Sequence, residues 1–313
     1  MADGRLSSMP VSNFAARCRF VIYSKGIEDK IDLFMPEGGL KTEWYLQNMS
    51  PFGKMPALAM GDGTRLFEAQ VIVDYLLDRY GDRGPSFVPA ASAAARALAR
   101  LVVQMHDVYL EPWQKYMYKG DFTPAQRLDA VATIGQHLDK LEELVAAGGP
   151  FLAGGGEPSV ADAALFPTYV FYTWILPKYY LPLLSPDQQH KPRPKLDGWF
   201  EHVRGTEVGA RVYEEVVGGL RVWLEGGRWE ALGLTRCDGG PGYTSTGAKA
   251  APVAAAAGGG GGMTQEEAEA QLQRTRLVPV VALKKNNIRF ENDMRMSMSK
   301  MYFRLQMLSR LLH

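Results

Sequence analysis

The stretch of residues 50–81 constrains the fold of this chain more than any other. An apolar run at residues 55–60 ends at the turn sequence GDG, residues 61–63. A second short run follows at residues 64–67, and apolar side chains then recur at helical spacing as far as Gly81. Short apolar runs between turn residues are typical of strands, and the later spacing is typical of a helix. The stretch therefore predicts a strand, a tight hairpin, a second strand and a helix.

Pro56 lies inside the first of these runs. Proline cannot donate to a β ladder, so Pro56 indicates either an edge strand or a special bend. A cis bond before Pro56 would turn the backbone of Met55 outward and leave its N–H and C=O free for an extended peptide ligand. The helix that starts near Glu68 would offer its first N–H groups to an anion. This part of the chain thus predicts a peptide-binding edge beside a carboxylate pocket.

The residues before this stretch predict the rest of one small α/β layer. Ser12 and Asn13 supply a helix start, and Gly26 supplies its stop. The expected elements are a strand at residues 3–8, a helix at residues 13–25, a strand at residues 28–34 and an irregular helix at residues 38–48. Together with the hairpin and its helix, these elements predict helices packed on a small sheet.

A loop at residues 82–90 interrupts the pattern, and the sequence beyond it is almost entirely helical. A long helical stripe is predicted within residues 91–118, and its members are Leu98, Leu101, Val102, Met105, Tyr109, Trp113 and Tyr116. Pro124 opens another helix, which should end at the glycines 148–149. These helices predict an all-α second domain.

Ser159 and Asp162 form a variant of the capping box, with Asp in place of Glu or Gln. The helix that they begin is apolar nearly all round, which predicts a central position in the helical domain. Residues 177–194 contain several prolines and predict a loop, and residues 195–217 predict two short helices. Residues 219–235 then add a tryptophan-bearing appendage.

The end of the chain differs in composition from the rest. Residues 236–262 are rich in glycine and alanine and predict a flexible linker. Residues 263–313 predict a helical tail, which carries seven Lys/Arg against two Asp/Glu between residues 281 and 313. Its apolar face consists of Met294, Met298, Met301, Leu305, Leu308 and Leu312. A basic Met/Leu helix can bind the groove of a protein partner, an acidic target-binding protein or a membrane surface. The alternative is that it folds back onto the second domain or is an unstructured appendage, and the sequence leaves both readings open.

Composition limits the classes of function. The 313 residues have a net charge of +1, which gives no global attraction to nucleic acid or anionic membrane. Two cysteines far apart, Cys18 and Cys237, indicate a reducing compartment rather than a disulfide framework. The sequence shows no run long and apolar enough to span a membrane and no presequence, so we expect a cytoplasmic protein.

Four blocks of this sequence stand out together: SNFAARCRFVIYSKGI at 12–27, NMSPFGKMPAL at 48–58, LFEAQVIVDYLLDRYG at 66–81 and FLAGGGEPSVADAALFP at 151–167. In their order and spacing they resemble the cytosolic glutathione transferase family, serine type. The resemblance covers roughly residues 5–217. It implies a thioredoxin-like, glutathione-binding domain followed by an all-helical domain. The expected boundaries are 1–82 and 90–235, followed by the linker at 236–262 and the basic tail at 263–313.

The family's reaction is attack by the glutathione thiolate on an electrophile, a detoxification chemistry. A free thiol with pKa near 8.5 is only slightly ionised at neutral pH, so the protein must stabilise the anion. Ser12 matches the family's catalytic serine, whose hydroxyl donates to the sulfur. The alternative is that Ser12 is only an N-cap. Ser7, Ser8 and Asn13 are nearby competitors for the donor role.

The resemblance also implies the glutathione contacts. The backbone of Met55, before Pro56, would pair with the cysteinyl part of the ligand, and Glu68 would bind its γ-glutamyl ammonium. Lys54 either reaches a ligand carboxylate or is an ordinary surface lysine. The family pattern has a serine after the glutamate, for the ligand's α-carboxylate, whereas this sequence has Ala69. One missing hydrogen bond to a charged group weakens binding by roughly 1.5–3 kcal/mol.

A second group of side chains is a candidate lining for an apolar co-substrate pocket between the domains, with packing in the helical core as the alternative. It consists of Phe14, His106, Tyr109, Trp113 and Tyr169. Cys18 lies on the apolar stripe of its helix and is expected to pack in the core. The five histidines are scattered and there is no CxxC, so no metal is expected.

Two functions therefore follow from the sequence. The first is a homodimeric enzyme that conjugates glutathione, its co-substrate, to a small hydrophobic electrophile through Ser12. The second is a non-catalytic scaffold or interaction module of the same fold, docked into a larger complex through residues 263–313. Ser12, Pro56 and Glu68 favour the enzyme, whereas Ala69 and the tail favour the scaffold.

Overall fold

The computed structural model describes residues 2–145, 149–186, 188 and 190–237. All of them belong to the first of two units into which the chain divides, residues 1–262; the second unit is residues 263–313. The predicted tail, and the predicted linker from residue 238 onward, lie outside the described residues.

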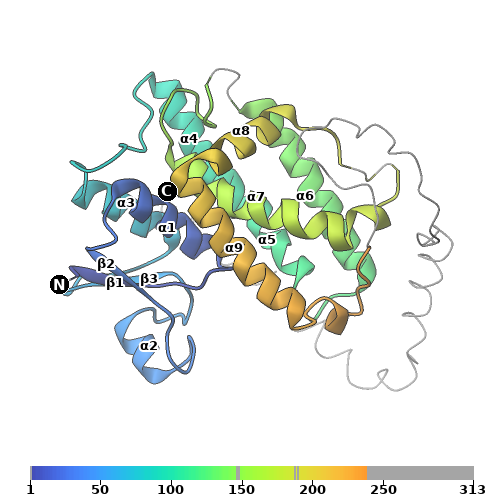
Figure 1. Ribbon diagram of the computed structural model, residues 1–313, viewed down its shortest axis with the longest axis horizontal. Helices are drawn as coiled ribbons and strands as arrows, with labels where there is room; N and C mark the ends of the chain where they lie inside the picture. Colours follow the sequence, from blue (N-terminus) through green and yellow to red (C-terminus); the bar gives the residue numbers. More distant parts are fainter. Residues whose placement is uncertain (1, 146–148, 187, 189, 238–313) are drawn as a thin grey trace, which may run out of the picture. The chain divides into compact units, whose positions relative to one another are not determined.

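The described strands form a single mixed sheet in the order β2-β1-β3-β4 (Figure 1). The strands are β1 (Gly4–Ser7), β2 (Ile31–Phe34), β3 (Ala57–Met60) and β4 (Arg65–Phe67). β1 is parallel to β2 and antiparallel to β3, and β3 is antiparallel to β4 across the GDG turn. Every strand predicted from the sequence is therefore present, each shorter than its predicted range.

Pro56 marks a bend and not an edge strand. β3 pairs with neighbours on both sides and so lies inside the sheet. Pro56 comes one residue before β3 begins at Ala57, so its missing N–H removes no ladder hydrogen bond. The Met55–Pro56 peptide bond is cis. Of the two predicted alternatives, the structure therefore has the bend.

Helices cover both faces of this sheet. α1 (Asn13–Lys25) packs against α3 (Ala69–Arg79) on one face, and α2 (Glu43–Asn48) lies on the other (Figure 1). α1 has the predicted bounds, because the Ser12 side chain accepts from the Ala15 N–H and Gly26 ends the helix at φ 60°. α1 is buried on nearly every side, since it also contacts two helices of the second half of the chain, α7 and α9.

The predicted stripe of residues 91–118 is correct in part, because Val102 is buried and Leu98, Met105 and Trp113 are partly buried against the core. The segment divides into α4 (Ala93–Met105), a π-helical turn η1 (His106–Leu110), α5 (Glu111–Gln114) and a 3₁₀ turn η2 (Lys115–Met117). Leu101 and Tyr109 are exposed, whereas the buried positions are Ala99, Val102, Val103, His106, Leu110, Gln114 and Met117. The wider turn shifts the helical phase, and the small Ala99 marks the face that actually packs.

α6 (Pro124–Leu144) and α7 (Val160–Tyr179) both begin with a complete capping box. The box predicted at the start of α7 is confirmed, because the Asp162 carboxylate accepts from the Ser159 backbone N–H at 2.7 Å. α7 is buried along most of its length, as its composition predicts. It continues through Pro177, so the predicted loop begins later than expected.

The remaining described elements are α8 (Pro194–Gly205), α9 (Glu207–Glu225) and two short 3₁₀ turns, η3 (Leu181–Leu183) and η4 (Glu230–Leu232). α9 extends well past the predicted end at residue 217. Trp229 does not belong to an appendage, because it is fully buried and stacks on Tyr179 with ring centroids 5.2 Å apart. Its indole N–H donates to the Met117 carbonyl at 2.9 Å.

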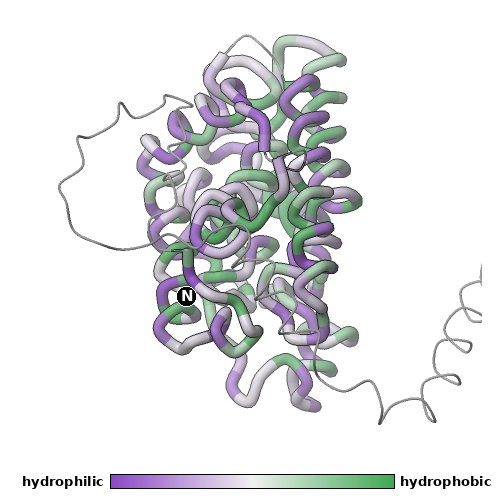
Figure 2. Tube along the Cα trace, turned by 90° about the vertical axis from the view of Figure 1, so that its right-hand side faces the viewer, coloured by the Kyte–Doolittle hydropathy of each residue, from purple (hydrophilic) through white to green (hydrophobic). Residues whose placement is uncertain are grey.

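This arrangement is a thioredoxin-like sheet domain followed by a helical domain. Figure 2 shows hydrophobic stretches running through the middle of the helical part, where α7 contacts α1, α4 and α9. The predicted boundary at residues 82–90 falls in the connection between α3 and α4. Among the described helices, none combines the length and apolar character needed to cross a membrane.

Candidate functional site

The strand register brings three separate segments together at one end of the sheet. Ala57 pairs with Phe67 across the hairpin, so Pro56 and Glu68 are the next residues on neighbouring strands. The Ala57 N–H also donates to the Ser7 hydroxyl at 2.9 Å, which places the end of β1 beside the same bend. The chain that leads from β1 to Ser12 therefore starts next to Pro56 and Glu68.

Ser12 occupies the N-cap of α1 and is half-buried. Its hydroxyl oxygen accepts from the Ala15 N–H at 3.3 Å, an interaction that leaves the hydroxyl proton available to a ligand. The N-terminus of a helix also favours a nearby anion. Ser12 thus combines a hydroxyl donor with the positive end of α1.

The three competing polar side chains are engaged elsewhere. Ser7 is fully buried beneath the bend, and the Ser8 hydroxyl accepts from Arg19 at 2.6 Å. Asn13 donates inward to Gln114 at 2.8 Å and to Thr168 at 3.0 Å. The geometry therefore leaves Ser12 as the best placed of the four candidates.

Glu68 precedes α3 in an unusual backbone conformation. Its φ of 74° is rare for a residue with a side chain, and such conformations often occur at functional sites. Its side chain is exposed and makes no capping hydrogen bond with α3. Ala69 is the buried first residue of the helix, where backbone N–H groups lack helical acceptors. The helix start can therefore bind an anion through its backbone, without the hydroxyl of a serine.

A buried cation lies between the two halves of the described chain. Arg17, on α1, donates to the Asp107 carboxylate, including a contact at 3.1 Å, and to Gln70 on α3 at 3.4 Å. The Arg17 side chain is almost completely buried, so loss of its Asp107 partner would leave an uncompensated buried charge. Hydrogen bonds from His106 and Arg17 hold the pKa of Asp107 well below its usual range, although burial opposes them. The positive charge of Arg17 is thus fixed close to the start of α3.

His106 connects this pair to α7. Its Nδ1 lies 2.7 Å from Asp107 Oδ1, and its Nε2 lies 2.6 Å from the Thr168 hydroxyl. Burial lowers the pKa of His106, so the ring favours its neutral form. Thr168 also accepts from Asn13, the residue after Ser12. A polar network therefore leads from the first turn of α1 into the helical domain.

The five predicted co-substrate residues differ in their exposure. His106 and Tyr169 are almost completely buried, and Tyr169 donates to Asp197 at 2.8 Å. Phe14 and Trp113 are half-buried, and Tyr109 is 51% exposed. Phe14, Trp113 and Tyr109 are therefore the members that a co-substrate can reach from solvent.

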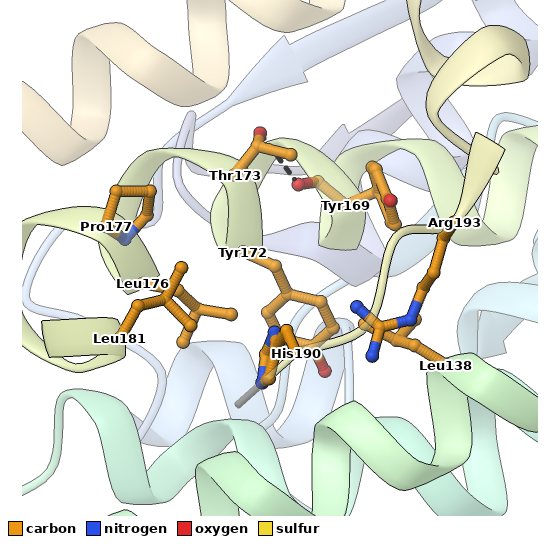
Figure 3. Close-up of a pocket in the computed structure, with 9 residues that line it drawn as sticks. All are labelled: Leu138, Tyr169, Tyr172, Thr173, Leu176, Pro177, Leu181, His190 and Arg193. Carbon is orange, nitrogen blue, oxygen red and sulfur yellow. Dashed lines mark hydrogen bonds between the residues drawn. The ribbon is translucent and has the colours of Figure 1, made fainter. Parts of the chain in front are cut away.

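Tyr169 borders a different cavity, between α6, α7 and the segment that leads to α8 (Figure 3). The cavity has a volume of about 20 Å³, which accommodates a single water-sized molecule. His190 and Arg193 close one side of it, as Figure 3 shows. This cavity is therefore too small to hold an organic co-substrate.

Cys18 packs in the core as predicted. It is fully buried, its thiol donates weakly to the Ala69 carbonyl at 3.7 Å, and burial raises its pKa to about 12. Such a thiol is unreactive at neutral pH. Within the described residues, no group of His, Cys, Asp and Glu side chains is arranged to hold a metal ion.

Comparison with known proteins settles the family. Residues 6–85 match the model of the glutathione S-transferase N-terminal domain, and residues 90–202 match the model of the C-terminal domain. The two matches together cover more than half of the chain. This chain belongs to the glutathione S-transferase family.

Individual relatives of this glutathione S-transferase chain are more distant. Glutathione S-transferase 3 of Zea mays is 34% identical over 107 residues, which are 34% of this chain and 47% of the relative. Glutathione S-transferase L3 of Arabidopsis thaliana is 27% identical over 208 residues, 65% of this chain and 79% of the relative. The chain thus spans about half the length of the maize protein in that match, and more of the Arabidopsis one.

Solved glutathione transferase structures share the fold. Rice GST1 in complex with glutathione aligns with a TM-score of 0.57 at 20% identity, over 71% of this chain and 97% of the rice chain. Glutathione transferase F7 of Populus trichocarpa aligns with a TM-score of 0.54 at 20% identity, over 68% and 99%. At this identity the likeness demonstrates the fold alone.

Three residues of this candidate site were not predicted from the sequence. Arg17 stands in the first resembling block, SNFAARCR, so the block itself carried a signal for it. Asp107 had no such signal, because it meets Arg17 only across 90 positions of sequence. Tyr45, fully buried, contacts both β1 and the bend before β3 and was likewise not singled out.

Proposed function

We propose that this protein is a glutathione transferase, which conjugates the thiolate of glutathione to small hydrophobic electrophiles. The sulfur forms a bond to an electrophilic carbon, and a leaving group departs or a double bond is saturated. The observation that carries the proposal is the position of Ser12. Its half-buried hydroxyl lies at the N-cap of α1 and keeps its proton for donation.

The role of Ser12 is to raise the population of thiolate. A hydroxyl donor and a helix N-terminus both stabilise the anion, and so lower the pKa of the bound thiol toward neutral pH. In this proposal Asn13 fixes the first turn of α1 through Gln114 and Thr168, so that the Ser12 hydroxyl keeps its direction. The alternative of a simple N-cap predicts no effect on the thiol.

Glutathione would lie along the bend before β3. The Met55 backbone would pair with its cysteinyl part, and Glu68 with its γ-glutamyl ammonium, as the family resemblance implies. The start of α3 at Ala69 would receive the α-carboxylate on backbone N–H groups. Lys54 is exposed on the same bend and would reach the other end of the ligand.

The electrophile would bind on the helical side of Ser12. Phe14 and Trp113 are half-buried aromatic side chains, and Tyr109 is exposed on η1. Glu111 follows Tyr109 by two residues, and burial together with the negative charge of Asp107 raises its pKa. This mixed surface supports a small co-substrate with an apolar body.

The test pairs two serines that cap different helices. Ser12 caps α1, and Ser92 caps α4 by accepting from the Ala95 N–H at 3.0 Å. Glutathione binding is measured by calorimetry, and turnover with a chlorodinitrobenzene. We expect Ser12→Ala to lower kcat/KM by roughly a hundredfold and to raise the pKa in the pH–rate profile, whereas Ser92→Ala retains both values.

Two outcomes would contradict the proposal. The absence of binding at millimolar glutathione would exclude the enzyme and leave the non-catalytic scaffold. Unchanged turnover in Ser12→Ala would exclude the assignment of Ser12 while leaving the reaction in place.

The family resemblance also supports a cytoplasmic homodimer. Large apolar side chains at the surface, such as Phe52 and Leu101, are groups that a second copy would cover. Sedimentation at several concentrations tests this assembly. The partner predicted for residues 263–313 lies outside the described residues, and a pull-down with and without that segment tests it.

A further inference from the structure

Two buried hydroxyl groups meet beneath the bend before β3. Tyr45 on α2 and Ser7 at the end of β1 are both fully buried, and their oxygens lie 2.7 Å apart. The Tyr45 hydroxyl donates to the Lys54 carbonyl at 2.8 Å. The Ser7 oxygen accepts from the Ala57 N–H at 2.9 Å. The pair therefore bridges the two residues that flank Met55 and Pro56.

The direction of these hydrogen bonds follows from counting protons. The Lys54 carbonyl can only accept, so the single proton of Tyr45 is used there. The short contact between Tyr45 and Ser7 must then be donated by Ser7. The other acceptor near Ser7, the Ala57 carbonyl, is more distant at 3.3 Å. The result is one directed chain, from the Ala57 N–H through Ser7 and Tyr45 to the Lys54 carbonyl.

This chain of hydrogen bonds connects three elements of the fold at one point. α2 supplies Tyr45, β1 supplies Ser7, and the bend supplies Lys54 and Ala57. A second contact from the α2 side reaches the same bend, because Lys41 Nζ donates to the Phe52 carbonyl at 2.9 Å. That contact is exposed, whereas the hydroxyl chain is closed to water, where each hydrogen bond is harder to replace.

We propose that Tyr45 and Ser7 are positioning residues for the glutathione site. They hold the backbone of residues 54–57 in the conformation that receives a peptide ligand, without touching the ligand themselves. The inference rests on the proposed function, since it assigns these residues a role in that same site. Loss of either hydroxyl weakens glutathione binding and leaves the chemistry at Ser12 intact.

A role in core packing alone predicts a different result. Tyr45 packs with Met49 and Ala57 in a small apolar cluster, and its ring would stay there in Tyr45→Phe. Tyr180 provides a matched control in the helical domain, because it is also fully buried and donates to a backbone carbonyl, that of Met117, at 2.8 Å. Both substitutions therefore remove a buried hydroxyl that donates to a backbone carbonyl, although the Tyr180 hydroxyl also interacts with Arg127.

Steady-state kinetics provide the first readout. We expect Tyr45→Phe and Ser7→Ala each to raise KM for glutathione about tenfold, with kcat within twofold, because they disturb binding before the reaction. KM of the double variant should be no higher than that of the more affected single variant, since both substitutions interrupt the same chain of hydrogen bonds. Tyr180→Phe should leave KM unchanged. If Tyr45→Phe behaves like Tyr180→Phe, the positioning role is wrong.

Hydrogen–deuterium exchange provides a second readout that needs no ligand. In Tyr45→Phe and Ser7→Ala, the amide of Ala57 should exchange at least tenfold faster, whereas the amides of α1 should not. Unchanged exchange at Ala57 would overturn the inference even if the wild type binds glutathione. A third outcome is faster exchange at Ala57 in the two variants while the wild type binds no glutathione. It would show that the hydrogen-bonded hydroxyls hold the bend and that the proposed function is wrong.

Discussion

Arg19 and Glu215 join the two halves of the described chain. Arg19 Nε, on α1, donates to Glu215 Oε2, on α9, at 2.6 Å, and the Arg19 side chain is 3% exposed. The same guanidinium donates to the Met9 carbonyl at 3.0 Å and to the Pro10 carbonyl at 2.8 Å. The segment that leads to Ser12 and the helix behind it are therefore held by one buried cation.

Glu215→Ala should destabilise the protein markedly. Removing one partner of a buried pair typically costs roughly 3–5 kcal/mol; because Glu215 is 28% exposed and Arg19 keeps its carbonyl acceptors, we expect about 2 kcal/mol. Glu214→Ala is the control, since Glu214 is 65% exposed and its ion pair with Arg221 is long at 3.8 Å. In urea unfolding, Glu214→Ala should lower the free energy of unfolding by less than about 0.5 kcal/mol. Equal losses would contradict the role of Glu215.

Asp162→Asn should destabilise the folded protein, although the side chain hardly changes in size. The carboxylate accepts from the Leu152 N–H and the Trp199 indole on one oxygen, and from the Ser159 N–H and hydroxyl on the other. An amide must direct its NH₂ at one of these donor pairs and leave buried donors unpaired. We expect a loss of at least about 2 kcal/mol in the free energy of unfolding.

The exposed capping box of α6 is the comparison for Asp162. Gln126 accepts from the Thr123 N–H at 2.9 Å and lies at the surface, where water can replace it. Gln126→Ala should therefore cost under about 1 kcal/mol. If both substitutions cost the same in chemical denaturation, burial is not what makes the Asp162 box important.

His190 should make stability depend on pH. Burial, and then the positive charge of Arg193, lower its pKa from 6.5 to about 4 in the folded protein. Between these values the unfolded chain binds a proton that the folded chain does not, so the free energy of unfolding falls as the pH falls from 6.5 to 4. One such group changes the free energy of unfolding by at most about 1.4 kcal/mol per pH unit.

His190→Gln separates this histidine from the other acidic transitions. Glutamine can still donate to the Val131 carbonyl, which His190 Nε2 approaches at 3.4 Å. The variant should have a shallower slope between pH 6.5 and pH 4 in urea titrations. His106, whose pKa burial also lowers, remains in the variant and should preserve part of the slope. Identical slopes in both proteins would show that His190 is not responsible.

The sequence predicted features whose causes are local. α1 has the predicted bounds because its cap, Ser12, and its left-handed stop, Gly26, are neighbours of the helix itself. The stripe of residues 91–118 holds only in part, because Leu101 and Tyr109 are exposed. The π-helical turn at His106–Leu110 changes the helical phase from there on, and no local signal announces such a turn. Trp229 was misplaced for a similar reason, since its partners Tyr179 and Met117 are distant in sequence.

The residues of the candidate site also differ in whether a local sequence block points to them. Ser12, Pro56 and Glu68 could be singled out because each lies within a short, recognisable block. The partners that fix their surroundings, such as Asp107 for Arg17, come from other elements and depend on how helices pack. Residues with several long-range hydrogen bonds are therefore the ones for which a structure is needed.

Ala69→Ser should strengthen glutathione binding. Ala69 is the first residue of α3, where the family pattern has a serine for the ligand's α-carboxylate and where backbone N–H groups lack helical acceptors. One added hydrogen bond to a charged group contributes roughly 1.5–3 kcal/mol, so we expect a Kd about ten- to a hundredfold lower by calorimetry. Ala93→Ser makes the same change at the first residue of α4 and should leave the Kd unchanged. If Ala69→Ser binds no better than the wild type, the carboxylate does not lie at the start of α3, and the assignment of Glu68 to the adjacent ammonium loses its geometric support.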